Sequence, residues 1–91
     1  MAVRITPEGD MAQVFPSGKV FTLLEMYRLI DCDMVEIVRL VDDRRWLVLD
    51  EEGLLREKPV NHTATFLYNR GRHSFSWIVG TVLLAEPHEV E

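Results

Sequence analysis

The chain has 91 residues, of which 47% are hydrophobic and 27% are charged. A chain of this length forms a single domain, and this composition is that of a folded globular protein rather than a disordered one. The formal net charge of −5 argues against general affinity for duplex DNA, whose phosphate backbone attracts cationic proteins.

The cellular compartment is indicated by what the sequence lacks. Cys32 is the one cysteine, so no internal disulfide can form, which favours a reducing environment. The N-terminal residues MAVRITPEGD show no basic-then-apolar signal pattern, and the apolar run over residues 77–85 is too short to span a membrane. We therefore expect a protein of the host cell cytosol, with no membrane partner.

The first part of the chain predicts a β-hairpin followed by a helix. Residues 2–6 and 11–15 are candidate strands joined by a turn at residues 7–10. Thr22 and Glu25 fit a capping box, in which each side chain accepts a hydrogen bond from the other residue's backbone. The helix should run from Leu23 to about Ile30, where the Asp31-Cys32-Asp33 segment breaks it.

The segment MVEIVRLVDDRRWLVLD, Met34–Asp50, predicts a second hairpin. Large apolar side chains occupy both odd and even positions of its two strands, so both faces need cover. We therefore expect this hairpin at the centre of the sheet. The residues expected in the core or in an interface are Val35, Ile37, Trp46 and Val48. If the helices leave part of the sheet uncovered, a two-fold homodimer would bury it; if they do not, the monomer covers both faces.

The last third of the chain predicts a helix and a strand. Asn61 can cap a helix that continues to about Asn69, and Gly71 suits its C-terminus. The final strand is expected over residues 75–84. The fold class is thus α+β, a mostly antiparallel sheet of about five strands with two helices in the order β-β-α-β-β-α-β. Residues 1–85 form the domain, and residues 86–91 form a mobile polar tail.

Five segments, in this order, resemble an uncharacterised family of short phage- and plasmid-borne α+β proteins, a "domain of unknown function" family. They are TLLEMYRLI, MVEIVRL, RRWLVLDEEGLL, PVNHTAT and WIVGTVLLA. The resemblance implies a phage or mobile-element origin and a compact α+β fold, and it supplies no activity. Family members usually carry Gly-Gly after the first helix and an arginine after the asparagine. Here those places hold Asp31-Cys32 and His62, which would alter a ligand site that uses the arginine.

Residues 56–77 form the most suggestive polar segment. They include Arg56, Lys58, Arg70 and Arg72 against one acid, Glu57, in a chain that is acidic elsewhere. A helix N-terminus within this segment would favour an anion, and its aromatic residues could stack on a base. The residues expected to hold a nucleotide-type anion are Asn61, His62, Thr65, Arg70 and Arg72. The alternative interpretation is that the arginines are solvated, Asn61 is only a cap, and the aromatics are core.

Other chemistry has little support in the sequence. The histidines and Cys32 do not show the paired spacing of a zinc site, and no glycine-framed nucleophile turn is present, so we expect no metal, no cofactor and no catalytic residue. Neighbouring aspartates should raise the pKa of the Cys32 thiol, which favours a structural role.

Two hypotheses of function follow. The first is a small non-enzymatic, phage- or plasmid-encoded binding protein, with an anti-defence role by analogy, that sequesters an anionic nucleotide-type ligand or blocks a host factor. The second is a protein-interaction module that docks through a sheet edge or through the acidic end of the hairpin.

Overall fold

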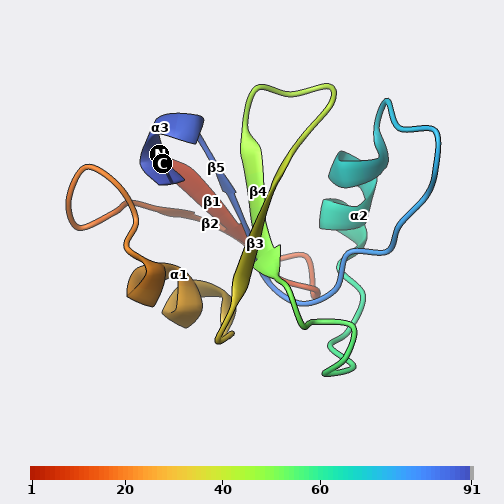
Figure 1. Ribbon diagram of the computed structural model, residues 1–91, viewed down its shortest axis with the longest axis horizontal. Coiled ribbons are helices and arrows are strands. Elements are labelled where there is room, and N and C mark those ends of the chain that lie inside the picture. Colours follow the sequence, from red (N-terminus) through yellow and green to blue (C-terminus); the bar gives the residue numbers. More distant parts are fainter. Residues whose placement is uncertain (91) are drawn as a thin grey trace.

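The computed structural model describes residues 1–90 and has three layers, a sheet with a helix on either face (Figure 1). In chain order the elements are β1 (Ala2–Ile5), β2 (Met11–Val14), α1 (Leu23–Ile30), β3 (Val35–Arg39), β4 (Trp46–Asp50), α2 (His62–Asn69), β5 (Val82–Ala85) and α3 (Pro87–Val90). All strand pairs are antiparallel. The α+β class and the five-stranded sheet are confirmed, and α3 is a third helix that the sequence did not predict.

Helix α1 begins at the predicted capping box. The Thr22 hydroxyl accepts from the Glu25 N–H at 3.1 Å, and the Glu25 carboxylate accepts from the Thr22 N–H at 2.8 Å. Asp31 ends the helix in the left-handed conformation, with φ of 55°. These local bonds fix where the helix starts and stops, which explains why sequence alone placed it correctly.

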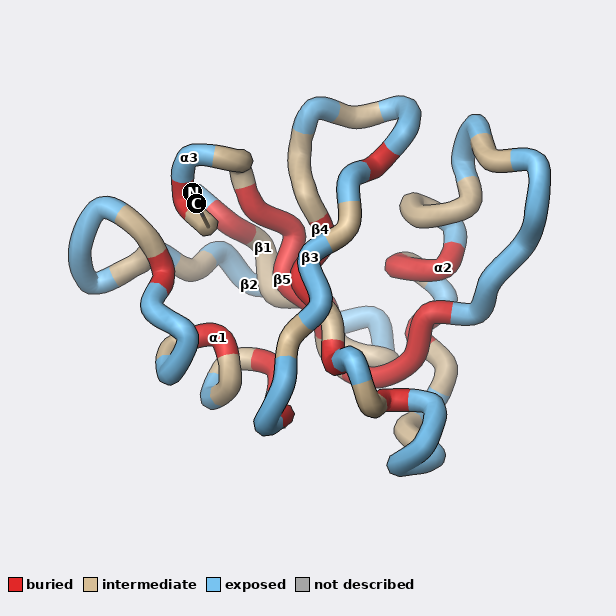
Figure 2. The backbone as a smooth tube through the Cα atoms, in the orientation of Figure 1, coloured by how far each residue is buried: buried red, intermediate tan, exposed pale blue. Residues whose placement is uncertain are grey.

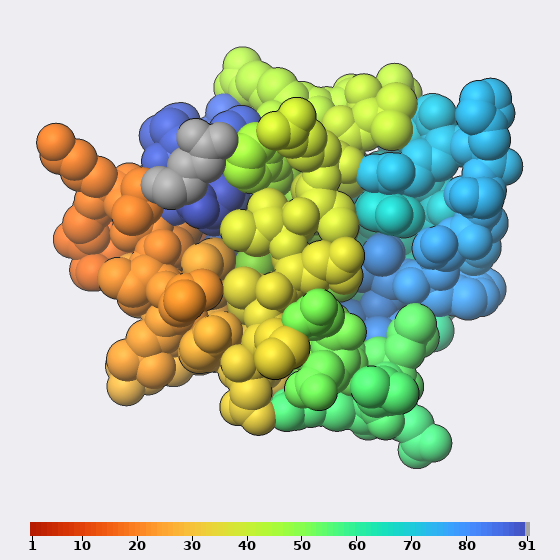
Figure 3. Space-filling model, in the orientation of Figure 1, coloured from red at the N-terminus to blue at the C-terminus, as the bar shows by residue number. Residues whose placement is uncertain are grey.

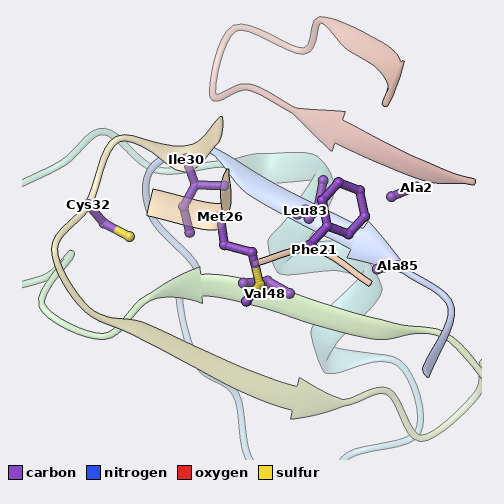
Figure 4. Close-up of a cluster of buried hydrophobic side chains, with 8 residues drawn as sticks. All are labelled: Ala2, Phe21, Met26, Ile30, Cys32, Val48, Leu83 and Ala85. Carbon is purple, nitrogen blue, oxygen red and sulfur yellow. The ribbon is translucent and has the colours of Figure 1, made fainter. Parts of the chain in front are cut away.

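The core is divided between the two faces of the sheet. On the α1 face, side chains from the helix meet the central strands (Figure 4). This cluster consists of Ala2, Phe21, Met26, Ile30, Cys32, Val48, Leu83 and Ala85. On the opposite face, α2 covers a second cluster of Ile5, Leu40, Leu47, Ala64, Ile78, Val82 and Leu84. The inner strands β1, β5 and β4 therefore carry buried clusters on both faces within one chain.

The position expected for the Met34–Asp50 hairpin is wrong. The strand order is β2-β1-β5-β4-β3, so β3 is an edge strand and β5 is central. All four residues of β5 are buried (Figure 2), whereas Val35 and Trp46 are half-buried and Ile37 is 38% exposed. Of the four residues expected in the core, only Val48 is fully buried. The two-sided apolar pattern of β3 and β4 reflects helices on both faces, not a central place in the sheet.

The final strand is shorter than expected. Gly80 has a φ of 76°, and its N–H donates to the Pro59 carbonyl at 2.8 Å, so the extended ladder begins only at Val82. A side chain at Gly80 would also lie 2.8 Å from the Lys58 side chain. Before this glycine, Phe75 and Trp77 lie on an irregular segment and are exposed.

The segment expected to be a mobile polar tail is folded over residues 87–90. Glu89 of α3 is 3% exposed, and its carboxylate lies 2.7 Å from the amino group of Met1. The same carboxylate accepts from the Glu86 N–H at 2.9 Å, and the Glu89 carbonyl accepts from the Phe21 N–H at 2.7 Å. The sequence shows only that this segment is polar, so it cannot indicate that one of its acidic side chains is buried and paired in this way. Glu91, also assigned to the tail, lies outside the described residues.

Candidate functional site

Asn61, expected to contact a ligand, is fully buried and bonded inside the protein. Its Nδ2 donates to the carbonyls of Ile5 at 3.0 Å and Gly80 at 2.9 Å, and its Oδ1 accepts from the Ala64 N–H at 3.1 Å. One amide therefore caps α2 and joins the helix to β1 and to the chain before β5. Its polar groups point into the protein interior.

Thr65 has a similar structural position. Its hydroxyl accepts from the Ile78 N–H at 2.9 Å and donates to the Ile78 carbonyl at 3.2 Å. His62, next to Asn61, is exposed, and its ring centroid lies 6.4 Å from that of Trp77.

The two arginines lie beyond the other end of α2. Arg72 donates to the carbonyls of Tyr68 at 2.8 Å and Arg39 at 2.6 Å, and its guanidinium lies 4.0 Å from the Tyr68 ring centroid. Arg70 is about half exposed, with Nε 3.9 Å from an Asp42 carboxylate oxygen. Because an eight-residue helix is about 12 Å long, the structure separates these arginines from Asn61 and His62. The five residues do not line one pocket.

A cleft that the sequence did not predict lies on the α2 face, between the edge strand β3 and the segment 76–79. Figure 3 shows the surface of β3 in yellow, with the blue surface of the segment after α2 across a hollow from it. The cleft has a volume of about 200 Å³. It is lined by Glu36, Val38, Leu49, Asp50, Glu51, Leu54, Tyr68, Ser76, Trp77, Ile78 and Val79. Its residues come from four separate parts of the chain, so no local sequence motif could indicate the cleft.

The rim of the cleft is acidic and its floor is apolar. Of the lining residues in the described part of the chain, three carry carboxylates and none carries a positive charge. Glu36 and Glu51 are exposed, and neither forms an ion pair with another residue in the range 1–90. Leu49 and Val38 are half-buried at the floor, beside buried Ile78.

The third carboxylate, that of Asp50, is neutralised inside the protein. Its side chain is fully buried, and Lys58 Nζ lies 2.7 Å from Oδ2. Burial alone would raise the pKa of Asp50, but hydrogen bonds from Lys58 and from the Glu52 N–H outweigh burial and lower it. Lys58 also donates to the Asp31 carbonyl at 2.5 Å, so the pair connects β4 to the end of α1.

The edge of β3 beside this cleft is open at two residues. The Glu51 N–H donates to the Met34 carbonyl at 3.0 Å, so the peptide groups of Met34 face β4. Because peptide groups alternate along a strand, those of Glu36 and Val38 also face β4, and those of Val35, Ile37 and Arg39 face outward. The Arg39 carbonyl is occupied by Arg72. We call the outward peptide groups of Val35 and Ile37 the free edge.

Exposed aromatic side chains lie next to the cleft. Phe75 is 61% exposed and Trp77 is 54% exposed, and their ring centroids are 4.8 Å apart in an edge-to-face arrangement. Phe66, on α2, is 66% exposed. The interpretation of the aromatics of residues 56–77 as core is therefore wrong for these three, whereas Tyr68 is half-buried and packs against the second cluster. Large aromatic side chains that stay exposed are typical of protein interfaces.

Other candidate chemistry is not assembled in the described residues. Cys32 is buried, and burial, with the nearby Asp50 carboxylate, raises the pKa of its thiol; the expected direction is confirmed, with burial as the main cause. Within residues 1–90, no three His, Cys, Asp or Glu side chains are grouped so that they could hold a metal ion. No helix among these residues has the length and apolarity needed to cross a bilayer.

Comparison with known protein families identifies the family of the chain. A family model described as a domain of unknown function (DUF3846) matches residues 2–91. No curated protein and no solved structure matches the chain.

Proposed function

The chain belongs to this family of unknown function, and we propose that it is a small non-enzymatic binding protein that pairs the free edge of β3 with an extended segment of a partner protein. The observation that carries the proposal is the pair of outward peptide groups at Val35 and Ile37, beside an open apolar cleft. Strand addition of this kind takes affinity from main-chain hydrogen bonds and specificity from adjacent side-chain pockets.

This proposal fits the geometry better than capture of an anionic nucleotide. The cleft is smaller than the roughly 300–1,000 Å³ typical of drug-sized ligand pockets, and its rim is acidic. The polar groups of Asn61, Thr65 and Arg72 are engaged within the protein. A protein partner needs only an edge and a place for one side chain, and both are present.

The biological setting that we propose is the cytosol of a bacterial host, with the gene carried by a phage or plasmid and the partner a host protein. Support for this setting is the sequence resemblance described above together with the small size of the chain, which is common among anti-defence proteins of mobile elements. Blocking a host factor by occupying one of its extended segments requires no catalytic group.

The proposal is tested with a displayed library of random twelve-residue peptides selected on the wild-type protein. Ile37→Pro removes the outward N–H of this residue and leaves the bonds to β4 intact, so selected peptides should lose binding to it at least tenfold. Ile37→Ala is the matched control, because it shortens the same side chain and keeps the N–H. Peptides that bind Ile37→Pro as well as wild type would refute pairing at the free edge.

A second copy of the chain is the competing occupant of the free edge. Native mass spectrometry of wild type and Ile37→Pro distinguishes the two. A monomer in both cases leaves the edge open for a different protein, as proposed. If wild type is a dimer and Ile37→Pro is a monomer, the free edge pairs with a second copy of the chain and not with a different protein.

A further inference from the structure

We infer that the partner segment is basic, with a lysine or arginine facing Glu36 and a large apolar side chain, two positions away, in the cleft. This inference rests on the proposed function and names the chemistry that the free edge selects. It follows from which side chains of β3 share a face with the cleft and from the charges around them.

The alternation of β3 decides which partner side chains reach the cleft. Glu36 and Val38 lie on the cleft face, while Val35 and Ile37 lie on the α1 face. In a paired strand, residues opposite Glu36 and Val38 share their face, and residues opposite Val35 and Ile37 lie on the other. A partner therefore presents two side chains to the cleft, spaced two residues apart.

The side chain opposite Glu36 meets negative charge. Glu36 and Glu51 both line the cleft, are exposed, and have no cationic partner among the described residues. Opposite charges directly across a strand pair are favourable and like charges are unfavourable. A lysine or arginine at this position of the partner supplies the missing cation, and an acid there is excluded.

The side chain opposite Val38 meets an apolar floor. Val38 packs against the cluster that includes Ile78, and both residues line the cleft together with Trp77. A volume of about 200 Å³ accommodates one large aliphatic or aromatic side chain.

Arg72 sets the far limit of pairing. Its guanidinium occupies the Arg39 carbonyl and places a positive charge at that end of the edge. Pairing therefore ends before Arg39, and the basic residue of the partner belongs at the Glu36 end. The partner segment is consequently short, about four residues opposite Val35–Val38.

Two capped peptides test the inference, Thr-Leu-Val-Lys-Val-Thr and the same sequence with glutamate in place of lysine. An antiparallel pairing of the first peptide sets leucine opposite Val38 and lysine opposite Glu36. NMR titration, read at the Val35 and Ile37 amides, should give roughly fivefold tighter binding of the lysine peptide in dilute buffer, as expected for one or two exposed charge pairs. The preference should vanish in Glu36→Gln/Glu51→Gln and at about 1 M salt, where the screening length is about 3 Å.

The outcomes separate the two proposals. If both peptides bind equally and Ile37→Pro abolishes both, the free edge is a binding site and the basic preference is wrong. Suppose that neither peptide shifts the NMR signals of the Val35 and Ile37 amides at millimolar concentration while a library-selected peptide does. The inferred combination of a basic residue and a large apolar residue is then wrong. If, in addition, no library-selected peptide loses binding to Ile37→Pro, the proposed function itself is wrong.

Discussion

The guanidinium of Arg72 donates a 2.6 Å hydrogen bond to the main-chain carbonyl of Arg39, at the last residue of β3. The same side chain donates to the Tyr68 carbonyl and lies over the Tyr68 ring. Arg72 thus holds the segment after α2 against the rim of the sheet and closes one end of the β3 edge. Two donors of a guanidinium that the sequence suggested for anion binding are thus engaged by main-chain carbonyls.

The alternation along β3 predicts a specific pattern of amide hydrogen exchange in the unbound protein. The Glu36 and Val38 amides, which face β4, should exchange slowly, whereas the Val35 and Ile37 amides should exchange at least tenfold faster. NMR-detected exchange in deuterated buffer measures all four. Equal protection of the four amides would mean that the free edge is already covered in solution.

Proline substitutions along β3 should differ sharply in their effect on stability. Ile37→Pro removes an outward N–H and should cost about 1 kcal/mol, because the ladder to β4 is unchanged. Glu36→Pro removes a ladder hydrogen bond and should cost about 3 kcal/mol or more. Urea denaturation of both variants compares them, and a similar loss in each would contradict the assigned direction of the peptide groups.

Local signals in the sequence placed most elements correctly, because local interactions define them. The capping box bounded α1, and Asn61 marked the start of α2. The position of a strand within the sheet is not a local property. β3 and β4 are apolar on both faces because α1 and α2 cover both faces, and this pattern is compatible with an edge or a centre. The centre is β5, which inserts between the two hairpins and is only four residues long.

The candidate site was harder to predict for a related reason. Asn61, Thr65 and Arg72 are polar residues in a basic segment, and sequence cannot show that their partners are carbonyls of Ile5, Ile78 and Arg39. The cleft joins β3 to residues that follow it by some forty positions, so its acidic rim appears only when the chain is folded. A sheet edge was one of the two docking surfaces in the second hypothesis from the sequence, which did not indicate which edge.

Replacing Asn61 by alanine should destabilise the protein by about 3–5 kcal/mol. The substitution removes the two interior hydrogen bonds that the amide donates, to the Ile5 and Gly80 carbonyls, and the one that it accepts from the Ala64 N–H. Thr65→Val, which removes bonds to one residue and keeps the side-chain volume, should cost about 1–2 kcal/mol. Chemical denaturation measures both. A cost below about 1 kcal/mol for Asn61→Ala would instead favour a role in ligand contact.

The Asp50–Lys58 pair predicts a large effect of removing one partner and a smaller effect of removing both. Lys58→Met leaves a buried carboxylate uncompensated and should cost about 3 kcal/mol at pH 7. Asp50→Asn combined with Lys58→Met removes that charge and should recover part of the loss. Thermal or urea denaturation of the single and double variants measures the difference. A double variant less stable than Lys58→Met would show that the buried charge is not the source of the cost.

Asp43 should make stability depend on pH at the acidic end of the range. Its carboxylate accepts from Arg45 Nε at 3.0 Å and Nη2 at 2.6 Å, and these bonds hold the pKa of Asp43 at about 2, below its ordinary 3.8. A carboxyl whose pKa is lower in the folded state stabilises the protein above pH 4, and this contribution is lost as the pH falls from about 4 towards 2. The full difference corresponds to about 2.5 kcal/mol, but both side chains are partly exposed, so we expect about 1 kcal/mol at pH 7.

Asp43→Asn isolates this contribution. The variant should be less stable than wild type by about 1 kcal/mol at pH 7. The difference should shrink as the pH falls towards 2, because wild-type Asp43 is half protonated near its pKa of about 2 and becomes fully protonated only below it. Asp42→Asn is the matched control, since Asp42 lies 3.9 Å from Arg70 and is exposed, so its effect should stay below about 0.5 kcal/mol at every pH. Denaturation of the three proteins between pH 2 and pH 7 gives the comparison. A gap between Asp43→Asn and wild type that persists unchanged at pH 2 would show that the loss of stability does not come from the charge of Asp43.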